Sequence, residues 1–337
     1  MYSCIRKFPT YLVTLSFIAM LIQISATIAS GANLKAIKKR GALKCGITLA
    51  PRMMDMQKSY CKALAVAIIG DAQKVEYLPI DGQSVTPFLA SDGVDVAIAS
   101  IASANKVELG VRSVGVFYYD GHSYLVPKAL GVKSAKELDG ASVCVLKGNR
   151  AQKNNYLFFE AKGMSFKPYY FKSYKDLREG YIKGKCDTIV GEALLLAALR
   201  SDLKKPDSHL LLPEVISKVP VGINVQKSDD DLAEAAKAVL QLLINSEELG
   251  VNSSNVEKLE KSREPTMREF FSSQNKNKYL VKIGLQERWM AKVLKETGNY
   301  GEIFERTIGL KTPVGRTRGL DALWPQGGMH YQEPMRN

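Results

Sequence analysis

The sequence has few of the residues from which metal centres and nucleophile pairs are built. Among its 337 residues there are three histidines, scattered singly at His122, His209 and His330. A zinc centre needs several ligands close together, and a serine nucleophile needs a histidine base. The sequence therefore predicts no metal site, no cofactor and no Ser-His pair, and it indicates that these histidines are surface or turn residues.

Aromatic residues are also scarce, and basic residues form no block. Aromatic side chains make up 8% of the chain, and 47 Lys and Arg residues are spread along it against 34 Asp and Glu. The formal net charge of +13 would favour a nucleic-acid partner only if the cations were clustered. We therefore expect no nucleic-acid partner. The hydrophobic share of 46% and the charged share of 24% are typical of a globular protein.

The N-terminus has the layout of a secretory signal. Arg6 and Lys7 form a short cationic head, and an apolar stretch follows over residues 11–24. Small residues then occupy positions 26–30, where a signal peptidase would cut. The apolar stretch is too short for a permanent membrane anchor. No cysteine follows the expected cut, so a lipid-modified N-terminus is not expected. Residues 1–30 are therefore predicted to be a cleavable signal peptide of an exported protein.

Cysteine usage agrees with export. Cys4 lies in the expected signal, which leaves four cysteines in the mature chain: Cys45, Cys61, Cys144 and Cys186. An oxidising compartment favours disulfides over metal sites, and four thiols allow three pairings. Buried free thiols are the alternative.

The order of expected elements alternates between strand and helix, twice. The first set has strands at residues 42–47, 75–78 and 94–99 and helices at 59–69 and 85–90. The second set has strands at residues 141–146, 167–171 and 186–190 and helices at 151–162 and 174–183. This alternation predicts an α/β protein with two largely parallel sheets, each covered by helices and binding ligands beyond the carboxyl ends of its strands.

Two extended segments link the sets, and helices follow. Residues 119–126 and 219–225 are the two crossings and predict a hinge. Beyond them, Ser228 is the expected cap of a helix that runs to Gly250. Further helices are expected at residues 253–271 and 285–297, with a polar loop at 272–278 and a tail from residue 311 that wraps over a surface.

Five segments resemble a known family. They are residues 115–121 (GVFYYDG), 133–145 (KSAKELDGASVCV), 212–218 (LPEVISK), 298–306 (GNYGEIFER) and 318–324 (RGLDALW). Together they resemble the general L-amino-acid-binding proteins of bacterial polar amino-acid ABC transporters, which form solute-binding protein family 3. The resemblance covers nearly the whole mature chain. It implies a two-lobed type II periplasmic binding protein with a hinge of two crossover segments and a C-terminal helical extension.

The resemblance also implies an organisation and a role. Lobe 1 would comprise residues 31–122 and the return 223–250, lobe 2 residues 123–222, and the extension packed on lobe 1 residues 251–337. Such a protein is not an enzyme; it resides in the periplasm, captures a polar L-amino acid between its lobes and delivers it to a membrane permease. The chain itself has no Gly-x-x-x-x-Gly-Lys-Ser/Thr loop of an ATPase.

Recognition of an amino acid needs an anion for the ammonium and cations or amides for the carboxylate. In lobe 2, Glu192 stands where the family usually has an ammonium-binding Asp, although a solvated Glu at a helix start is the alternative. Gly148, Asn149 and Arg150 replace the family's Gly-Thr-Thr-like turn at a helix start, which would hold the carboxylate. The sequence therefore predicts that lobe 2 carries most of the ligand contacts.

Lobe 1 departs from the family pattern. The usual Thr-x-x-Arg falls on Ala102 and Asn105, so the carboxylate clamp is missing. Ser100, Ser103 and Asn105 are the remaining expected contacts. Lys106 could act as a point charge, but it lacks the planar fork of an arginine and is expected to be an ordinary surface residue.

The departures leave two alternatives to a transport receptor. One is a degenerate relative with a lost or altered ligand. The other is a periplasmic dehydratase-like enzyme on the same scaffold, with Glu192 as general acid and Lys106 beside it.

Within the two-lobed frame we expect one disulfide in each lobe. Cys144 and Cys186 begin or occupy strands of one sheet, and a loop shorter than the family's keeps Cys61 near Cys45. The prediction is therefore Cys45–Cys61 in lobe 1 and Cys144–Cys186 in lobe 2.

Overall fold

The computed structural model describes residues 34–48, 51–80, 85–100, 110–276 and 278–333. The chain divides into two units, residues 1–30 and 31–337. The expected signal peptide lies outside the described residues, and everything below concerns the second unit.

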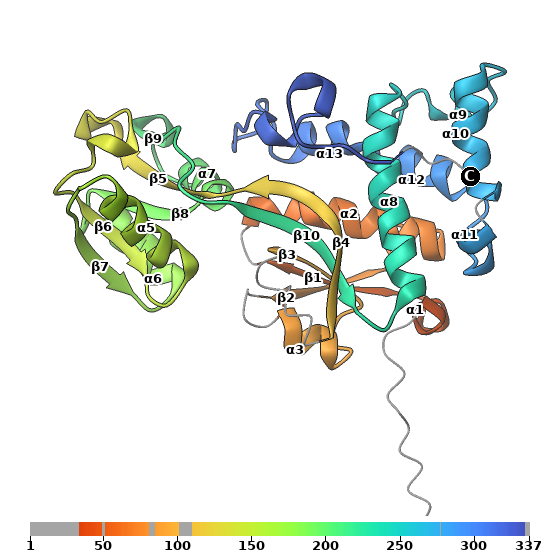
Figure 1. Ribbon diagram of the computed structural model, residues 1–337, viewed down its shortest axis with the longest axis horizontal. Coiled ribbons are helices and arrows are strands. Elements are labelled where there is room, and N and C mark those ends of the chain that lie inside the picture. Colours follow the sequence, from red (N-terminus) through yellow and green to blue (C-terminus); the bar gives the residue numbers. More distant parts are fainter. Residues whose placement is uncertain (1–33, 49–50, 81–84, 101–109, 277, 334–337) are drawn as a thin grey trace, which may run out of the picture. The chain divides into compact units, whose positions relative to one another are not determined.

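Within the described residues, the first sheet has five strands, four of which run in the same direction. Its order is β2-β1-β3-β10-β4, and its strands are β1 (Leu43–Thr48), β2 (Val75–Ile80), β3 (Val96–Ser100), β4 (Val111–Asp120) and β10 (Val219–Gln226). β1 pairs in parallel with β2 and β3, whereas β10 is antiparallel to β3 and β4. The largely parallel sheet is confirmed, with one reversed strand from a distant part of the sequence (Figure 1).

The second sheet repeats this arrangement. Its order is β7-β6-β8-β5-β9, and its strands are β5 (His122–Pro127), β6 (Ser142–Leu146), β7 (Lys167–Phe171), β8 (Thr188–Glu192) and β9 (His209–Leu211). β6 is parallel to β7 and β8, and β5 is antiparallel to β8 and β9. The two sheets therefore share one topology, as the repeated alternation predicts.

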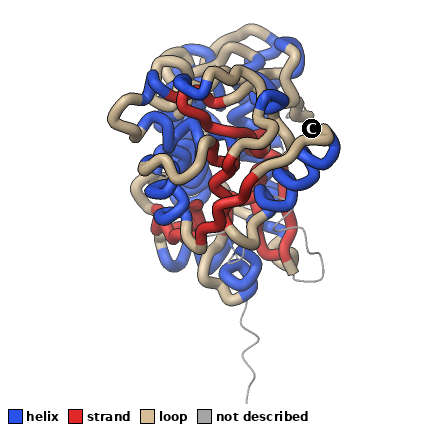
Figure 2. Tube along the Cα trace, turned by 90° about the vertical axis from the view of Figure 1, so that its left-hand side faces the viewer, coloured by secondary structure: helices blue, strands red, loops and turns tan. Residues whose placement is uncertain are grey.

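Helices cover both faces of the first sheet. They are α1 (Leu34–Arg40), α2 (Pro51–Ile69), α3 (Val85–Ala90) and α8 (Asp230–Glu248). Val96 and Ile98 of β3 lie in the core cluster shared with α2 and α8. Ala97 and Ala99 point to the opposite face, where they cluster with α3. This alternation follows from the two-residue period of a strand, and Figure 2 shows strands running between helices.

The second sheet is covered in the same way, by α5 (Arg150–Ala161), α6 (Tyr174–Ile182) and α7 (Ala193–Ser201). Val143 of β6 packs in one cluster with Phe159 of α5. Cys144, on the other face of β6, packs with Leu177 of α6 and Leu196 of α7.

Each disulfide joins a strand to a segment outside the strands, within the same half of the α/β structure. Cys45 of β1 is bonded to Cys61 of α2, and Cys144 of β6 is bonded to Cys186, which precedes β8. All four residues are buried. This is the pairing that we expected from the sequence.

Two segments connect the sheets and touch one another. Gly121 lies between β4 and β5, and residues 212–218 lie between β9 and β10. His122 N–H donates to Ser217 Oγ at 3.0 Å, and Ile216 N–H donates to the His122 carbonyl at 2.8 Å. A Cβ atom at Gly121 would lie 2.3 Å from the Ser217 carbonyl oxygen, so only glycine allows this approach.

The C-terminal part is more finely divided than the sequence predicts. Its helices are α9 (Val256–Leu259), α10 (Pro265–Lys276), α11 (Lys278–Lys282), α12 (Trp289–Thr297) and α13 (Tyr300–Thr307). The single helix expected at residues 253–271 is wrong, because Glu264 accepts from two backbone N–H groups and starts a new helix at Pro265. The loop expected at 272–278 is also wrong: residues 272–276, which include no Gly or Pro, continue α10, and α11 begins at Lys278, while residue 277 lies outside the described residues.

The cap of α8 is displaced by one residue from the expectation. Asp229 Oδ1, rather than Ser228, accepts from Leu232 N–H at 3.0 Å. A cap side chain reaches the N–H three residues ahead, and for a helix that begins at Asp230 this residue is Asp229.

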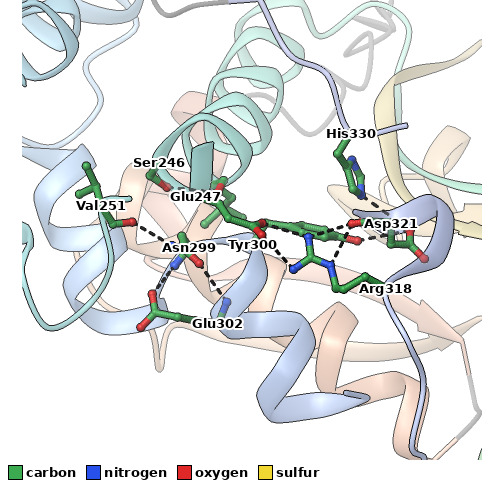
Figure 3. A network of polar contacts seen from close by, with 10 residues as sticks. Ser246, Glu247, Val251, Asn299, Tyr300, Glu302, Arg318, Asp321 and His330 are labelled. Atoms are coloured by element: carbon green, nitrogen blue, oxygen red, sulfur yellow. Dashed lines mark hydrogen bonds and ion pairs between the residues drawn. The ribbon is translucent and has the colours of Figure 1, made fainter. Parts of the chain in front are cut away.

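The tail beyond α13 is anchored along the edge strand β4. Asp321, which is 3% exposed, accepts from the Tyr119 N–H of β4 at 2.7 Å. Arg318 pairs with Glu247 of α8 at 3.0 Å and lies over the Tyr300 ring (Figure 3). The tail thus covers an edge strand. The sequence predicted that the tail wraps over a surface, but it did not indicate these buried contacts.

Candidate ligand-binding site

Glu192 lies where β8 ends and α7 begins. It pairs in register with His122 of β5, and its backbone occupies the capping position of α7. Its carboxylate makes no capping hydrogen bond, and the residue is half-buried. Burial raises the pKa of Glu192, while the charge of Arg150 acts in the opposite direction. The structure therefore holds a carboxylate at the carboxyl end of β8 that the helix does not use.

Asn149 and Arg150 lie at the start of α5, as the sequence predicts. Asn149 Oδ1 accepts from Gln152 N–H at 2.9 Å, and Gln152 Oε1 in turn accepts from Gly148 N–H at 2.7 Å. The side chain of Asn149 is thus occupied by capping. Asn149 can therefore support a carboxylate site only by ordering the start of α5.

Arg150 brings together residues of both sheets. Its Nη2 donates to Ser100 Oγ, at the end of β3, at 2.8 Å. Its charge also influences the pKa values of Glu192 and His122. Ser100, Arg150 and Glu192 therefore belong to one polar neighbourhood.

The other expected contacts of lobe 1, Ser103 and Asn105, lie outside the described residues, as do Ala102 and Lys106.

His122 is not the surface histidine that the sequence indicated. It is 3% exposed, and its Nδ1 lies 2.6 Å from Ser217 Oγ and 2.9 Å from Asn154 Nδ2. Because Asn154 donates to Nδ1, the ring carries its proton on Nε2. Burial first, and then the charge of Arg150, lowers the pKa of His122 to about 4, so the ring is neutral at physiological pH.

Asp120 is a second buried group that sequence reasoning missed. It is 8% exposed and ends β4, beside Gly121. Burial, and then repulsion by Glu192, raises the pKa of Asp120 to about 7. The signal available in the sequence was the run Asp120-Gly121-His122, which places an acid and a histidine at the junction of two strands.

The arrangement offers opposite charges that suit a zwitterion. A carboxylate at Glu192 can hold an ammonium group, and the Arg150 guanidinium and the start of α5 can hold a carboxylate. In the part of the chain that the structure describes, no three His, Cys, Asp or Glu side chains are grouped so that they could hold a metal ion.

Curated relatives match almost the full chain. The general L-amino acid-binding periplasmic protein AapJ of Rhizobium johnstonii is 36% identical over 330 residues, which cover 94% of this chain and 97% of that protein. The glutamate/glutamine/aspartate/asparagine-binding protein BztA of Rhodobacter capsulatus is 35% identical over 94% of this chain and 97% of its own. The chain belongs to the periplasmic amino-acid-binding proteins of ABC transporters. A scan against protein-family models found no match.

A solved structure of the same family has this fold. The ABC transporter periplasmic binding protein of Brucella ovis, with glutathione bound, superimposes with a TM-score of 0.82 at 34% identity. The match covers 90% of this chain and 99% of that one. The two-lobed α/β fold implied by the sequence resemblance is therefore confirmed.

The relatives of this amino-acid-binding protein are named as binding proteins rather than as enzymes. Over its described residues, the structure contains no helix that combines the length and the apolar character needed to cross a membrane.

Proposed function

We propose that this protein captures a polar L-amino acid in the periplasm and delivers it to the permease of an ABC transporter, without catalysing a reaction. The observation that carries the proposal is the Glu192 carboxylate, which caps nothing and lies near the Arg150 guanidinium. One group suits the ammonium of an amino acid and the other suits its carboxylate. Relatives at 35–36% identity are named for the same class of ligand.

The proposal divides the chain as the sequence resemblance implies. Residues 31–122 and 223–250 form lobe 1, residues 123–222 form lobe 2, and residues 251–337 form the extension. The membership of the two sheets supports this division, because the first sheet holds β1–β4 and the part of β10 from residue 223, and the second sheet holds β5–β9; the proposed boundaries cut through β5 after residue 122 and through β10 after residue 222.

Each site residue has a role in this proposal. Glu192 holds the ammonium, and Arg150 with the helix start behind Asn149 holds the carboxylate. Ser100, Ser103 and Asn105 complete the contacts from lobe 1. Lobe 2 supplies all the charged contacts, so it contributes most of the affinity.

Export through a signal peptide at residues 1–30 is part of the proposal. Two buried disulfides support it, since disulfides persist in oxidising compartments. Expression of the full chain in a Gram-negative host, followed by mass spectrometry of the periplasmic fraction, tests it. A chain that begins near residue 31 is expected, and an uncut chain in the cytoplasm would contradict export.

Binding is tested by isothermal titration calorimetry of the mature chain. The titrants are L-glutamate, L-glutamine, L-aspartate, L-asparagine and glutathione, and at least one of the four amino acids is expected to bind. Glu192→Gln keeps the size of the side chain and removes its charge. It should weaken binding by about 1.5–3 kcal/mol, the contribution of a charged hydrogen bond.

Ser173→Ala is the matched control. Ser173 caps α6, because its Oγ accepts from Asp176 N–H at 3.1 Å. The substitution removes this cap and leaves the proposed ligand-binding residues unchanged. Its affinity should equal that of the parent. If only glutathione gives binding heat, the ligand is a peptide and the proposed amino-acid ligand is wrong. If none of the five titrants gives binding heat, the protein is a degenerate relative with a lost or altered ligand.

A further inference from the structure

The first turn of α7 is capped from a distant part of the chain. The first N–H groups of a helix have no partners inside the helix. At α7 the capping position belongs to Glu192, whose side chain accepts none of them. Instead, Ala193 N–H donates to the Gly121 carbonyl at 2.8 Å, and Leu194 N–H donates to Asp120 Oδ2 at 3.2 Å.

Asp120 is engaged on both carboxylate oxygens. While Oδ2 accepts from α7, Oδ1 accepts from Gly121 N–H at 2.8 Å. The charge of Glu192 repels Asp120, and the charge of Arg316, in the tail after α13, attracts it. The Tyr118 side chain, two residues before Asp120 in β4, also interacts electrostatically with Asp120.

We propose that Asp120 is a positioning residue for ligand capture. By capping α7 in place of Glu192, it leaves the Glu192 carboxylate available to the ammonium of the ligand. Its negative charge, close to that carboxylate, strengthens the hold on a cation. This inference rests on the proposed function, because it assigns the ammonium to Glu192.

The arrangement makes affinity depend on pH. The pKa of Asp120 is about 7, raised by burial and then by Glu192. A protonated Asp120 loses its charge and one of its two acceptors. Both losses weaken the hold on an ammonium group, so affinity should rise as the pH rises through 7.

The test uses L-glutamine, whose side chain does not titrate in this range. We expect the dissociation constant of the mature parent protein to fall at least about fivefold between pH 6 and pH 8, the low end of typical coupling between sites. Asp120→Asn imitates the protonated acid. It should bind at all pH values as the parent binds at low pH, and the same pH dependence in variant and parent would overturn the proposal.

Asp229→Asn is the matched control. Asp229 is also a buried acid that caps a helix, and its pKa is raised to about 6. It lies after the last residue of β10, whereas Asp120 pairs with Val219, the first residue of that strand. Its variant should keep the pH profile of the parent. A flattened profile in Asp229→Asn would assign the pH dependence to general stability and overturn the role of Asp120.

A second measurement needs no ligand. In amide NMR spectra of the ligand-free parent, the Gly121 and Leu194 N–H resonances should titrate together with a midpoint near pH 7 and should not titrate in Asp120→Asn. Absence of this titration overturns the capping role even where L-glutamine binds. If the amides titrate as expected and none of the four amino acids binds, the proposed function fails and the capping role stands.

Discussion

Asp120 and His122 are two residues apart, yet burial shifts their protonation in opposite directions. The pKa of the acid rises to about 7 and the pKa of the imidazole falls to about 4. In both cases the protein interior disfavours the charged form. Asp120 and His122 are therefore both neutral between about pH 4 and pH 7, and Asp120 becomes anionic near pH 7.

The histidine predicts a loss of stability in acid. Because the folded-state pKa of His122 lies below the usual 6.5, the unfolded chain takes up a proton first. Its contribution is complete above about pH 6.5 and is lost as the pH falls towards 4, by about 3 kcal/mol. His122→Asn keeps an acceptor for Asn154 and should lack this loss. Urea unfolding at several pH values measures it, and parallel curves for parent and variant would contradict the burial.

The acid predicts the opposite slope. The folded-state pKa of Asp120 lies above its usual value of 3.8, so its contribution is complete below about pH 4 and is lost as the pH rises through 7. The loss is on the order of 4 kcal/mol. Relative to the parent, Asp120→Asn should therefore gain unfolding free energy as the pH rises. A constant difference between the two proteins across this range would show that Asp120 is ionised throughout.

At the scale of elements, α13 is held by a capping box. Asn299 Oδ1 accepts from Glu302 N–H at 2.9 Å, and Glu302 Oε2 accepts from Asn299 N–H at 2.8 Å (Figure 3). Asn299 Nδ2 also donates to the Val251 carbonyl at 2.8 Å, which ties α13 to the turn after α8.

Asn299→Ala should lower the unfolding free energy by about 2 kcal/mol, because it removes the cap and leaves a buried carbonyl without its donor. Asn299→Ser keeps a capping oxygen and loses only the bond to Val251, so its cost should be about half as large. Thermal unfolding of both variants measures the costs. Equal stability of Asn299→Ala and parent would mean that α13 does not depend on its cap.

The two disulfides stabilise their elements to different degrees. Cys45 and Cys61 are 16 residues apart, whereas Cys144 and Cys186 are 42 apart. Because a longer closed loop restricts the unfolded chain more, we expect removal of the first pair to cost about 3 kcal/mol and removal of the second about 4 kcal/mol. Paired Cys→Ala variants, unfolded in urea, measure this order. The reverse order would indicate that residual structure in the unfolded chain decides the cost.

At the scale of the whole molecule, ligand binding should appear as stabilisation. A ligand at one hundred times its dissociation constant adds about 2.7 kcal/mol to the free energy of unfolding. For a chain of this length, that corresponds to a rise of roughly 4 °C in the melting temperature. A thermal-shift screen of the common amino acids measures it. Stabilisation by Lys or Arg but by none of the polar neutral or acidic amino acids would contradict a site organised around one carboxylate and one guanidinium.

Much of the fold could be predicted from the sequence because it depends on local pattern. Runs of apolar residues and helix-period repeats gave the order of strands and helices, and two α/β sets placed each cysteine pair within one sheet. The resemblance to the family depended on collinear segments such as residues 115–121 and 298–306. The exceptions, such as the division of residues 253–271 into α9 and α10, lay where caps rather than periodicity decide the ends.

The candidate site could be predicted only in part. Glu192, Asn149 and Arg150 follow strand ends, which a linear pattern reveals, and their placement at the ends of β8 and β6 follows from it. The roles of Asp120 and His122 required the tertiary structure. The acceptor that caps α7 comes from 74 residues earlier in the chain, and His122 is desolvated by contacts with Ser217, 95 residues away. Burial and capping across such separations depend on which segments the fold brings together, and no local pattern in the sequence records that.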